Sequence, residues 1–149
     1  MSDNHNDTDA PDTVTQQLST RQRVLLAEDN PLDQVAIMRL LAKQDLDVTV
    51  VQNGRQAVDA CCSGEYGLIL LDILMPEMDG FEAAHRIRQW EGLAGGHVPI
   101  IALTAYSLKA VQDKCQSVGM DGCLAKPVDL QELKALCSRY LSADVPAPR

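Results

Sequence analysis

Reactive and charged side chains follow several of the short apolar runs in this 149-residue sequence. They comprise three carboxylates, one hydroxyl and one amine: Glu28, Asp29, Asp72, Thr104 and Lys126. Each apolar run is short enough for one buried strand, and amphipathic stretches separate the runs. If the strands form one parallel sheet, their carboxyl ends meet at one edge, where such sheets bind ligands. The pattern therefore predicts that these side chains gather at a single site.

Charge at that site favours a bound cation. Two carboxylates about 4 Å apart repel each other by about 4 kcal/mol at an effective dielectric constant near 20, and a third carboxylate increases the repulsion. Lys126 offsets one of the three negative charges, which leaves a deficit that a divalent ion would cancel. Mg²⁺ suits one or two carboxylates with water and phosphate oxygens, whereas Ca²⁺ takes more protein ligands. A metal, a nucleophilic carboxylate, a hydroxyl and an amine together indicate phosphoryl transfer to a carboxylate.

The elements that position these residues alternate between strand and helix. Apolar runs predict strands at residues 24–27, 48–51, 68–71, 98–103 and 123–125. Amphipathic stretches predict helices at residues 31–44, 55–63, 80–90, 108–118 and 130–141. Asn30 is a plausible N-cap of the first helix, with Pro31 at its first position. Right-handed crossovers then give an α/β fold with a doubly wound parallel sheet covered on both faces.

Composition limits the partners and the compartment. The chain has 13 Lys and Arg against 21 Asp and Glu, so its net charge is −8 and both phosphate backbones and anionic lipids repel it. No apolar run reaches the roughly 20 residues that span a bilayer, and the polar, acidic start is unlike a secretory signal. Five cysteines without a Cys-x-x-Cys pair indicate reduced thiols. We expect a cytoplasmic protein that binds neither nucleic acid nor membrane.

The sequence divides into one domain and two tails. Residues 1–20 hold four aspartates, no lysine or arginine and few large apolar side chains, which predicts a disordered acidic tail. Residues 21–141 carry the alternating pattern and form the domain, and residues 142–149, with two prolines, form a disordered C-terminal tail. The initial methionine and a tail at each end favour a complete chain.

Four short motifs, in order along the chain, resemble the receiver domain of bacterial two-component response regulators. They are Glu28-Asp29-Asn30, the run from Leu70 to Gly80 around Asp72, the run from Ile101 to Ala105, and Lys126-Pro127. The resemblance covers about residues 22–141. It implies the flavodoxin-like fold, with five parallel strands in the order 2-1-3-4-5 and five helices.

The resemblance also implies how the acidic residues act. Asp72 would accept a phosphoryl group from a phosphohistidine of a sensor kinase or a histidine phosphotransfer protein. Asp29, Asp72 and the backbone carbonyl of Leu74 would ligate Mg²⁺, and Glu28 would act directly or through water. A cis peptide before Pro127 would place the preceding lysine amine.

Phosphate-binding and switch positions follow from the same resemblance. Thr104 and Lys126 would bind phosphoryl oxygens, with Ala105 beside them. Receivers usually place Tyr or Phe three residues before the lysine, where this chain has Cys123. Because a thiol is too small to sweep out the space of a ring, the usual coupling to the face of the fourth helix and fifth strand should be weak unless Tyr106 takes over.

The first predicted helix offers a docking surface. Four of its residues are expected to face the sheet: Ala36, Ile37, Leu40 and Leu41. Leu32, Val35 and Met38 then lie on the outward side, beside the phosphorylation edge. Three apolar residues at helical spacing favour a docking patch over incidental exposure. In relatives, this helix packs on the helical bundle that carries the donor histidine.

These features predict a single-domain response regulator that signals by a conformational shift or by onward phosphotransfer to a partner protein. We expect no enzymatic activity beyond its own phosphorylation and dephosphorylation. Weak coupling at Cys123 favours a phosphorelay role through the docking patch.

Three alternatives remain. The chain could be the receiver domain of a hybrid histidine kinase. A haloacid-dehalogenase-type phosphatase would share the aspartate, the Mg²⁺ and the lysine, but it needs a second acid where this chain has Leu74. A receiver-like module that no longer takes phosphate is disfavoured, because every expected phosphorylation residue is present.

Overall fold

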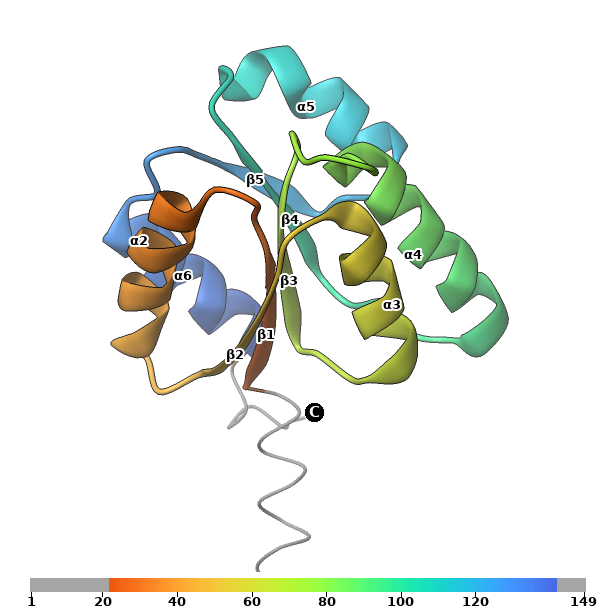
Figure 1. Ribbon diagram of the computed structural model, residues 1–149, viewed down its shortest axis with the longest axis horizontal. Coiled ribbons are helices and arrows are strands. Elements are labelled where there is room, and N and C mark those ends of the chain that lie inside the picture. The colour runs from red at the N-terminus through yellow and green to blue at the C-terminus, as the bar shows by residue number, and fades with distance from the viewer. Residues whose placement is uncertain (1–21, 142–149) are drawn as a thin grey trace, which may run out of the picture.

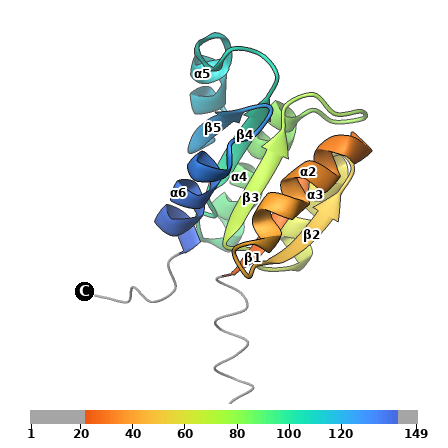
Figure 2. The same ribbon diagram turned by 90° about the vertical axis from the view of Figure 1, so that its left-hand side faces the viewer.

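The computed structural model describes residues 22–141, which form a five-stranded parallel sheet flanked by helices (Figure 1). The strands are β1 (Arg23–Ala27), β2 (Asp47–Val51), β3 (Leu68–Asp72), β4 (Ile100–Thr104) and β5 (Gly122–Ala125). The helices are α2 (Pro31–Ala42), α3 (Gly54–Ser63), α4 (Gly80–Ala94), α5 (Leu108–Ser117) and α6 (Leu130–Leu141). The strand order β2-β1-β3-β4-β5 confirms the predicted flavodoxin-like fold (Figure 2). The tails predicted at residues 1–20 and 142–149 lie outside the described residues.

The central strands are apolar because helices cover both of their faces. Every residue of β3 and β4 is buried, and β1 is buried from Val24 onward. The edge strands β2 and β5 are only partly covered. Nearly continuous apolar runs therefore mark the centre of the sheet, as expected for parallel strands without a solvated face.

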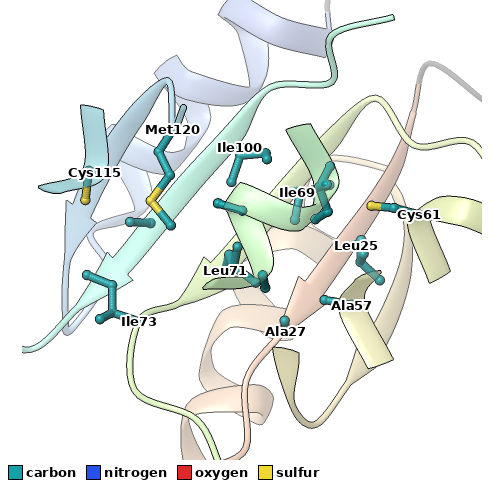
Figure 3. Packing of buried hydrophobic residues seen from close by; sticks show 14 of the residues in the cluster. Leu25, Ala27, Ala57, Cys61, Ile69, Leu71, Ile73, Ile100, Cys115 and Met120 are labelled. Atoms are coloured by element: carbon teal, nitrogen blue, oxygen red, sulfur yellow. The ribbon is translucent and has the colours of Figure 1, made fainter. Parts of the chain in front are cut away.

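Two layers of helices cover the sheet, with α2 and α6 on one face and α3 and α4 on the other (Figure 1). Successive residues of β1 point to opposite faces. Leu26 packs in the same cluster as Leu41 of α2, whereas Leu25 joins Ala57 and Cys61 of α3 (Figure 3). Both layers hold the strands so that their carboxyl ends lie along one edge.

Side-chain caps determine where the helices begin. Asn30 Oδ1 accepts hydrogen bonds from the backbone N–H groups of Leu32 at 2.8 Å and Asp33 at 3.3 Å. Asn30 is therefore the N-cap of α2, and Pro31 occupies its first position, as predicted. The N-caps of α3, α4 and α5 are Asn53, Asp79 and Ser107. Each cap lies in a loop that leaves the carboxyl end of a strand.

Two predicted boundaries are wrong for a shared reason. α4 continues to Ala94 instead of ending at residue 90, and β4 begins at Ile100 instead of residue 98. The buried carboxylate of Glu91 in α4 accepts a hydrogen bond from the backbone N–H of Val98 at 2.7 Å. Val98 is therefore tied to the helix, and the strand begins after Pro99.

The helices of residues 22–141 are too short or too polar to cross a membrane. The longest of them, α4, has 15 residues, whereas about 20 apolar residues are needed to span a bilayer.

Candidate phosphorylation site

The predicted site residues meet at the carboxyl edge of the sheet. Asp72 and Thr104 are the last residues of β3 and β4, Glu28 follows β1, and Lys126 follows β5. Backbone pairing continues past the strand ends. The Glu28 N–H donates to the carbonyl of Val51 at 3.0 Å, and the Lys126 N–H donates to the carbonyl of Thr104 at 2.8 Å. These backbone hydrogen bonds fix the positions from which the Glu28 and Lys126 side chains extend.

The ammonium group of Lys126 contacts three carboxylates. Its Nζ lies 2.6 Å from Glu28 Oε1, 3.1 Å from Asp33 Oδ2 and 3.2 Å from Asp72 Oδ2. The side chains of Glu28 and Asp72 are only 1% and 8% exposed. The peptide before Pro127 is cis, as the resemblance implied. The segment from Glu28 to Asp33, the end of β3 and the loop after β5, which are distant in sequence from one another, thus supply one charged cluster.

Burial and charge set the protonation of this cluster. Burial raises the pKa of Glu28 to about 7, although the ion pair with Lys126 lowers it. Burial lowers the pKa of Lys126, but the contacts with Glu28, Asp33 and Asp72 outweigh burial and raise the pKa above its ordinary value. Lys126 therefore stays charged, and one ammonium group faces an excess of negative charge.

Three carboxylates at this edge could hold a metal ion. One oxygen each from Glu28, Asp29 and Asp72 lies within 4.8 Å of the others. Asp29 is exposed, which leaves that side open to water, whereas the other two are buried. Among the described residues, Lys126 Nζ, 2.6 Å away, is the partner of Glu28 Oε1. Three hard oxygen donors that share only one ammonium group fit a hard divalent cation.

The backbone at the start of α4 packs closely against that of Asp72. A Cβ atom at Gly80 would collide with the carbonyl oxygen of Asp72, so only glycine permits this approach. The Gly80 N–H donates to the carbonyl of Ile73 at 2.8 Å. The Leu74 N–H donates to Asp72 Oδ1 at 3.3 Å, and the Leu74 side chain is 56% exposed. The start of α4 is thus packed directly against the end of β3.

The expected phosphate-binding and switch residues differ in how far they are buried. Thr104 is buried, and its Oγ1 accepts a hydrogen bond from the Tyr106 N–H at 2.9 Å. Ala105 and Tyr106 are exposed. Cys123 is half-buried against the core, where burial and the nearby Cys123 thiol raise the pKa of Cys115 in α5 to about 11. The thiol therefore lies under α5, whereas the Tyr106 ring lies on the surface.

The predicted docking residues of α2 differ in exposure. Leu32 and Val35 are 80% and 50% exposed, as the docking patch requires. Met38 is half-buried and packs against the core, so it belongs to the patch only in part. Val35 and Met38 line a shallow, mostly apolar groove with Val50 of β2.

The prediction that Ala36 faces the sheet is wrong. Ile37 and Leu41 are buried, but Ala36 is exposed. Residues four apart share one helix face, and Met38 and Leu40 extend the face of Ile37 and Leu41 as partly buried neighbours, whereas Ala36 lies outside it. Ala36 instead lines a small cleft with Asp33 and Lys126.

Sequence reasoning missed Asp33 as a member of the site. Its position, three residues after the cap Asn30, is typical of an acid that interacts with the helix dipole. Its contact with Lys126 crosses 93 positions of sequence. The sequence did hold a signal for Asp33. This residue lies in the first turn of the helix that begins at this edge, four residues after the candidate metal ligand Asp29.

The comparisons with known proteins agree with this geometry. Residues 24–138 match the model of the response regulator receiver domain. The chain is 41% identical over 113 residues to hybrid signal transduction histidine kinase I of Dictyostelium discoideum, covering 72% of this chain and 6% of that protein. This chain spans 6% to 16% of the length of that and similar relatives.

Two solved structures share the fold. One is the receiver domain of the Pseudomonas aeruginosa PAO1 sensor histidine kinase PA1611, which holds a magnesium ion in its active site cleft. It is 39% identical with a TM-score of 0.73, over 81% of this chain and 98% of that chain. The other is the Saccharomyces cerevisiae complex of the phosphotransfer protein Ypd1 with the receiver domain of Ssk1. That match has 30% identity and a TM-score of 0.77, over 83% of this chain and 91% of that chain.

The doubly wound sheet, with acids, a threonine and a lysine at its carboxyl edge, agrees with these matches. The chain belongs to the response regulator receiver domain family and acts in two-component or phosphorelay signalling.

Proposed function

We propose that this chain accepts a phosphoryl group on Asp72 from a phosphohistidine, with Mg²⁺ bound. The observation that carries the proposal is the position of Asp72, which ends a fully buried strand 3.2 Å from Lys126 and beside the other two metal-binding carboxylates. A carboxylate there is held in place and faces both a cation site and an ammonium group. Such positioning and charge neutralisation provide most of the catalysis in phosphoryl transfer.

The transfer forms one bond and breaks one. An Asp72 carboxylate oxygen attacks phosphorus, the P–N bond of the phosphohistidine breaks, and its electron pair returns to the imidazole nitrogen. Lys126 Nζ donates a charge-assisted hydrogen bond to a phosphoryl oxygen, and the Thr104 hydroxyl, whose oxygen accepts the Tyr106 N–H, donates its own hydrogen to another. Ala105, which is exposed and directly follows Thr104, would lie beside the bound phosphoryl group.

Glu28, Asp29 and Asp72 would hold the Mg²⁺, together with the backbone carbonyl of Leu74, which the family resemblance implies. When bound, the ion neutralises charge on the acids and on the transferred group. The magnesium in the related P. aeruginosa receiver domain supports this choice of ion.

The donor would be a histidine kinase or a histidine phosphotransfer protein that docks on Leu32 and Val35, with Met38 at the edge of the contact. Exposed apolar side chains next to the phosphorylation edge support this surface. The yeast complex of Ypd1 with a receiver domain supports the class of partner. Five free cysteines, all within the described residues, favour the reducing cytoplasm. Neither nucleic acid nor membrane is a proposed partner.

Two settings fit this activity. In the first, the chain is a single-domain regulator that passes its signal to a downstream protein by a conformational shift or by onward transfer, and it catalyses only its own phosphorylation and dephosphorylation. In the second, it is the receiver region of a hybrid kinase. Matches to kinases from Dictyostelium, plants and Pseudomonas favour this second setting.

Acetyl phosphate with Mg²⁺ tests the proposal. Intact-mass measurement should show one added phosphoryl group on the wild-type chain and none on Asp72→Asn, since an amide is not a nucleophile here. Asp79→Asn, which keeps the cap of α4, is the matched control and should be labelled like the wild type. Labelling of Asp72→Asn at the wild-type rate would show that the acceptor is wrong. Steady release of phosphate from phosphomonoesters would favour the phosphatase alternative.

A further inference from the structure

Asp33 is the most accessible of the carboxylates that contact Lys126. Its side chain is 41% exposed, compared with 1% for Glu28 and 8% for Asp72. Its Oδ2 accepts a hydrogen bond from Lys126 Nζ at 3.1 Å, so the contact has proper geometry. Asp33 lies in the first turn of α2, directly after the exposed Leu32.

The ammonium group has no donor to spare. A lysine ammonium carries three N–H bonds, and three carboxylates surround this one. A phosphoryl oxygen on Asp72 would be a further acceptor, and it would bring additional negative charge. Lys126 can therefore bind that oxygen well only if one of its present contacts weakens.

The three contacts differ in how easily they can be given up. Asp72 carries the phosphoryl group, so Lys126 must stay near it. Glu28 is buried, and without Lys126 its carboxylate would lie uncompensated in the core. Asp33 is half-exposed, so water can replace the lysine at little cost. A cleft of about 80 Å³ between Asp33, Ala36 and Lys126 gives room for such a water.

We propose that Asp33 is a positioning residue that restrains Lys126 in the unphosphorylated site and releases it to the phosphoryl oxygen. The inference rests on the proposed function and adds to it the contact that must break. Asp33 then opposes phosphorylation, although it is part of the phosphorylation site. Because it is on the docking helix, a bound donor that carries a cation there would compete for Asp33 and assist the release.

Beryllofluoride, which mimics an aspartyl phosphoryl group, tests the inference on the purified chain with Mg²⁺. Asp33→Asn should bind it roughly 2- to 5-fold more tightly than the wild type, the fold-change expected for loss of a half-exposed ion pair. The rate of labelling by acetyl phosphate should rise by a similar factor. In that reaction an Asp72 oxygen bonds to phosphorus, the P–O bond to acetate breaks with its electron pair on acetate, and Lys126 keeps its proton.

Two variants and one further measurement distinguish a restraint on Lys126 from a general charge effect and from a structural role of Asp33. Asp33→Glu keeps the charge and should behave like the wild type. Glu77→Gln removes an exposed negative charge from the loop after β3, at the same edge, and should leave the affinity unchanged. The melting temperature of Asp33→Asn should fall slightly, because an acid in the first turn of α2 stabilises that helix. A merely structural residue would lower both stability and beryllofluoride affinity.

The outcomes are distinguishable. Equal or weaker beryllofluoride binding by Asp33→Asn would overturn the inference, and so would an equal gain in Glu77→Gln, which would indicate a general charge effect. Failure of the wild type to bind beryllofluoride or to be labelled would instead overturn the proposed function.

Discussion

The two charged clusters of this domain lie at opposite edges of the sheet and differ in how their charges are balanced. At the carboxyl edge, Lys126 faces Glu28, Asp33 and Asp72. At the amino edge, the guanidinium of Arg88 in α4 joins the helix to the strands. Arg88 Nη1 lies 2.6 Å from Glu91, and Nη2 lies 2.8 Å from Asp121, which precedes β5.

Each carboxylate oxygen of the amino-edge cluster has a partner. The second oxygen of Glu91 accepts the Val98 N–H at 2.7 Å, and Asp121 accepts the Ile100 N–H at 2.8 Å. His97 Nε2 lies 2.9 Å from the other Asp121 oxygen. Arg88 Nε also donates to a backbone carbonyl, that of Gly119, at 2.9 Å.

The difference shows what each cluster does. The oxygens of the amino-edge acids have partners within the domain, so this network ties α4 to the starts of β4 and β5. The carboxyl-edge cluster has one ammonium group for three contacting carboxylates. Such an excess of negative charge is reduced when a cation binds, which indicates a site that is completed by a ligand. We therefore expect variants at the two edges to fail in different ways.

Lys126→Ala should produce the largest change at the carboxyl edge. Beryllofluoride affinity should fall roughly 10- to 100-fold, the loss expected for a hydrogen bond between charged groups. Mg²⁺ binding should persist, because the three metal-binding carboxylates remain. Isothermal titration with each ligand measures both effects, and Lys134→Ala on α6 is the matched control. Unchanged beryllofluoride affinity would show that Lys126 does not contact the phosphoryl group.

Arg88→Met should instead reduce stability and leave phosphorylation intact. The side chains of Arg88 and Glu91 are 15% and 7% exposed, and breaking such a buried pair costs about 3 kcal/mol of unfolding free energy. Urea unfolding measures the loss. The control is Arg86→Met, which removes an exposed pair with Glu82 and should cost less than about 0.5 kcal/mol. If Arg88→Met lost labelling by acetyl phosphate while folded, the division between the two edges would be wrong.

The smallest expected effect concerns the helix α5. Beryllofluoride with Mg²⁺ should shift the amide resonances of Asp29, Asp72, Thr104 and Lys126 strongly. Shifts at the amino edge should be small, because that edge lies at the opposite end of the strands. Shifts along α5 should also be small, because Cys123 lacks a ring that could move with Thr104. Large shifts along α5 would contradict this and would indicate output through that helix, with exposed Tyr106 as the coupling residue.

The strands, the helices and the doubly wound parallel sheet could be predicted from local patterns, whereas the strand order was implied by the resemblance to receiver domains. Strands that are buried on both faces need apolar side chains at nearly every position, and helix starts need caps such as Asn30. Chemically active residues in a parallel sheet collect after the strand ends, so Asp72, Thr104 and Lys126 could be assigned to one edge from their positions alone. The boundaries of α4 and β4 could not, because Glu91 reaches across to Val98.

By itself, the sequence determined the strands, the helices, the N-cap Asn30 and the gathering of the candidate site residues at one edge, because each depends on neighbours within a few positions or on the alternation of strand and helix. The tertiary structure alone decided that Asp33 contacts Lys126, that Arg88 pairs with Asp121, and that Ala36 is exposed. These outcomes depend on how each helix is rotated and placed over the sheet. That placement results from the packing of many side chains distant in sequence, so no local pattern records it.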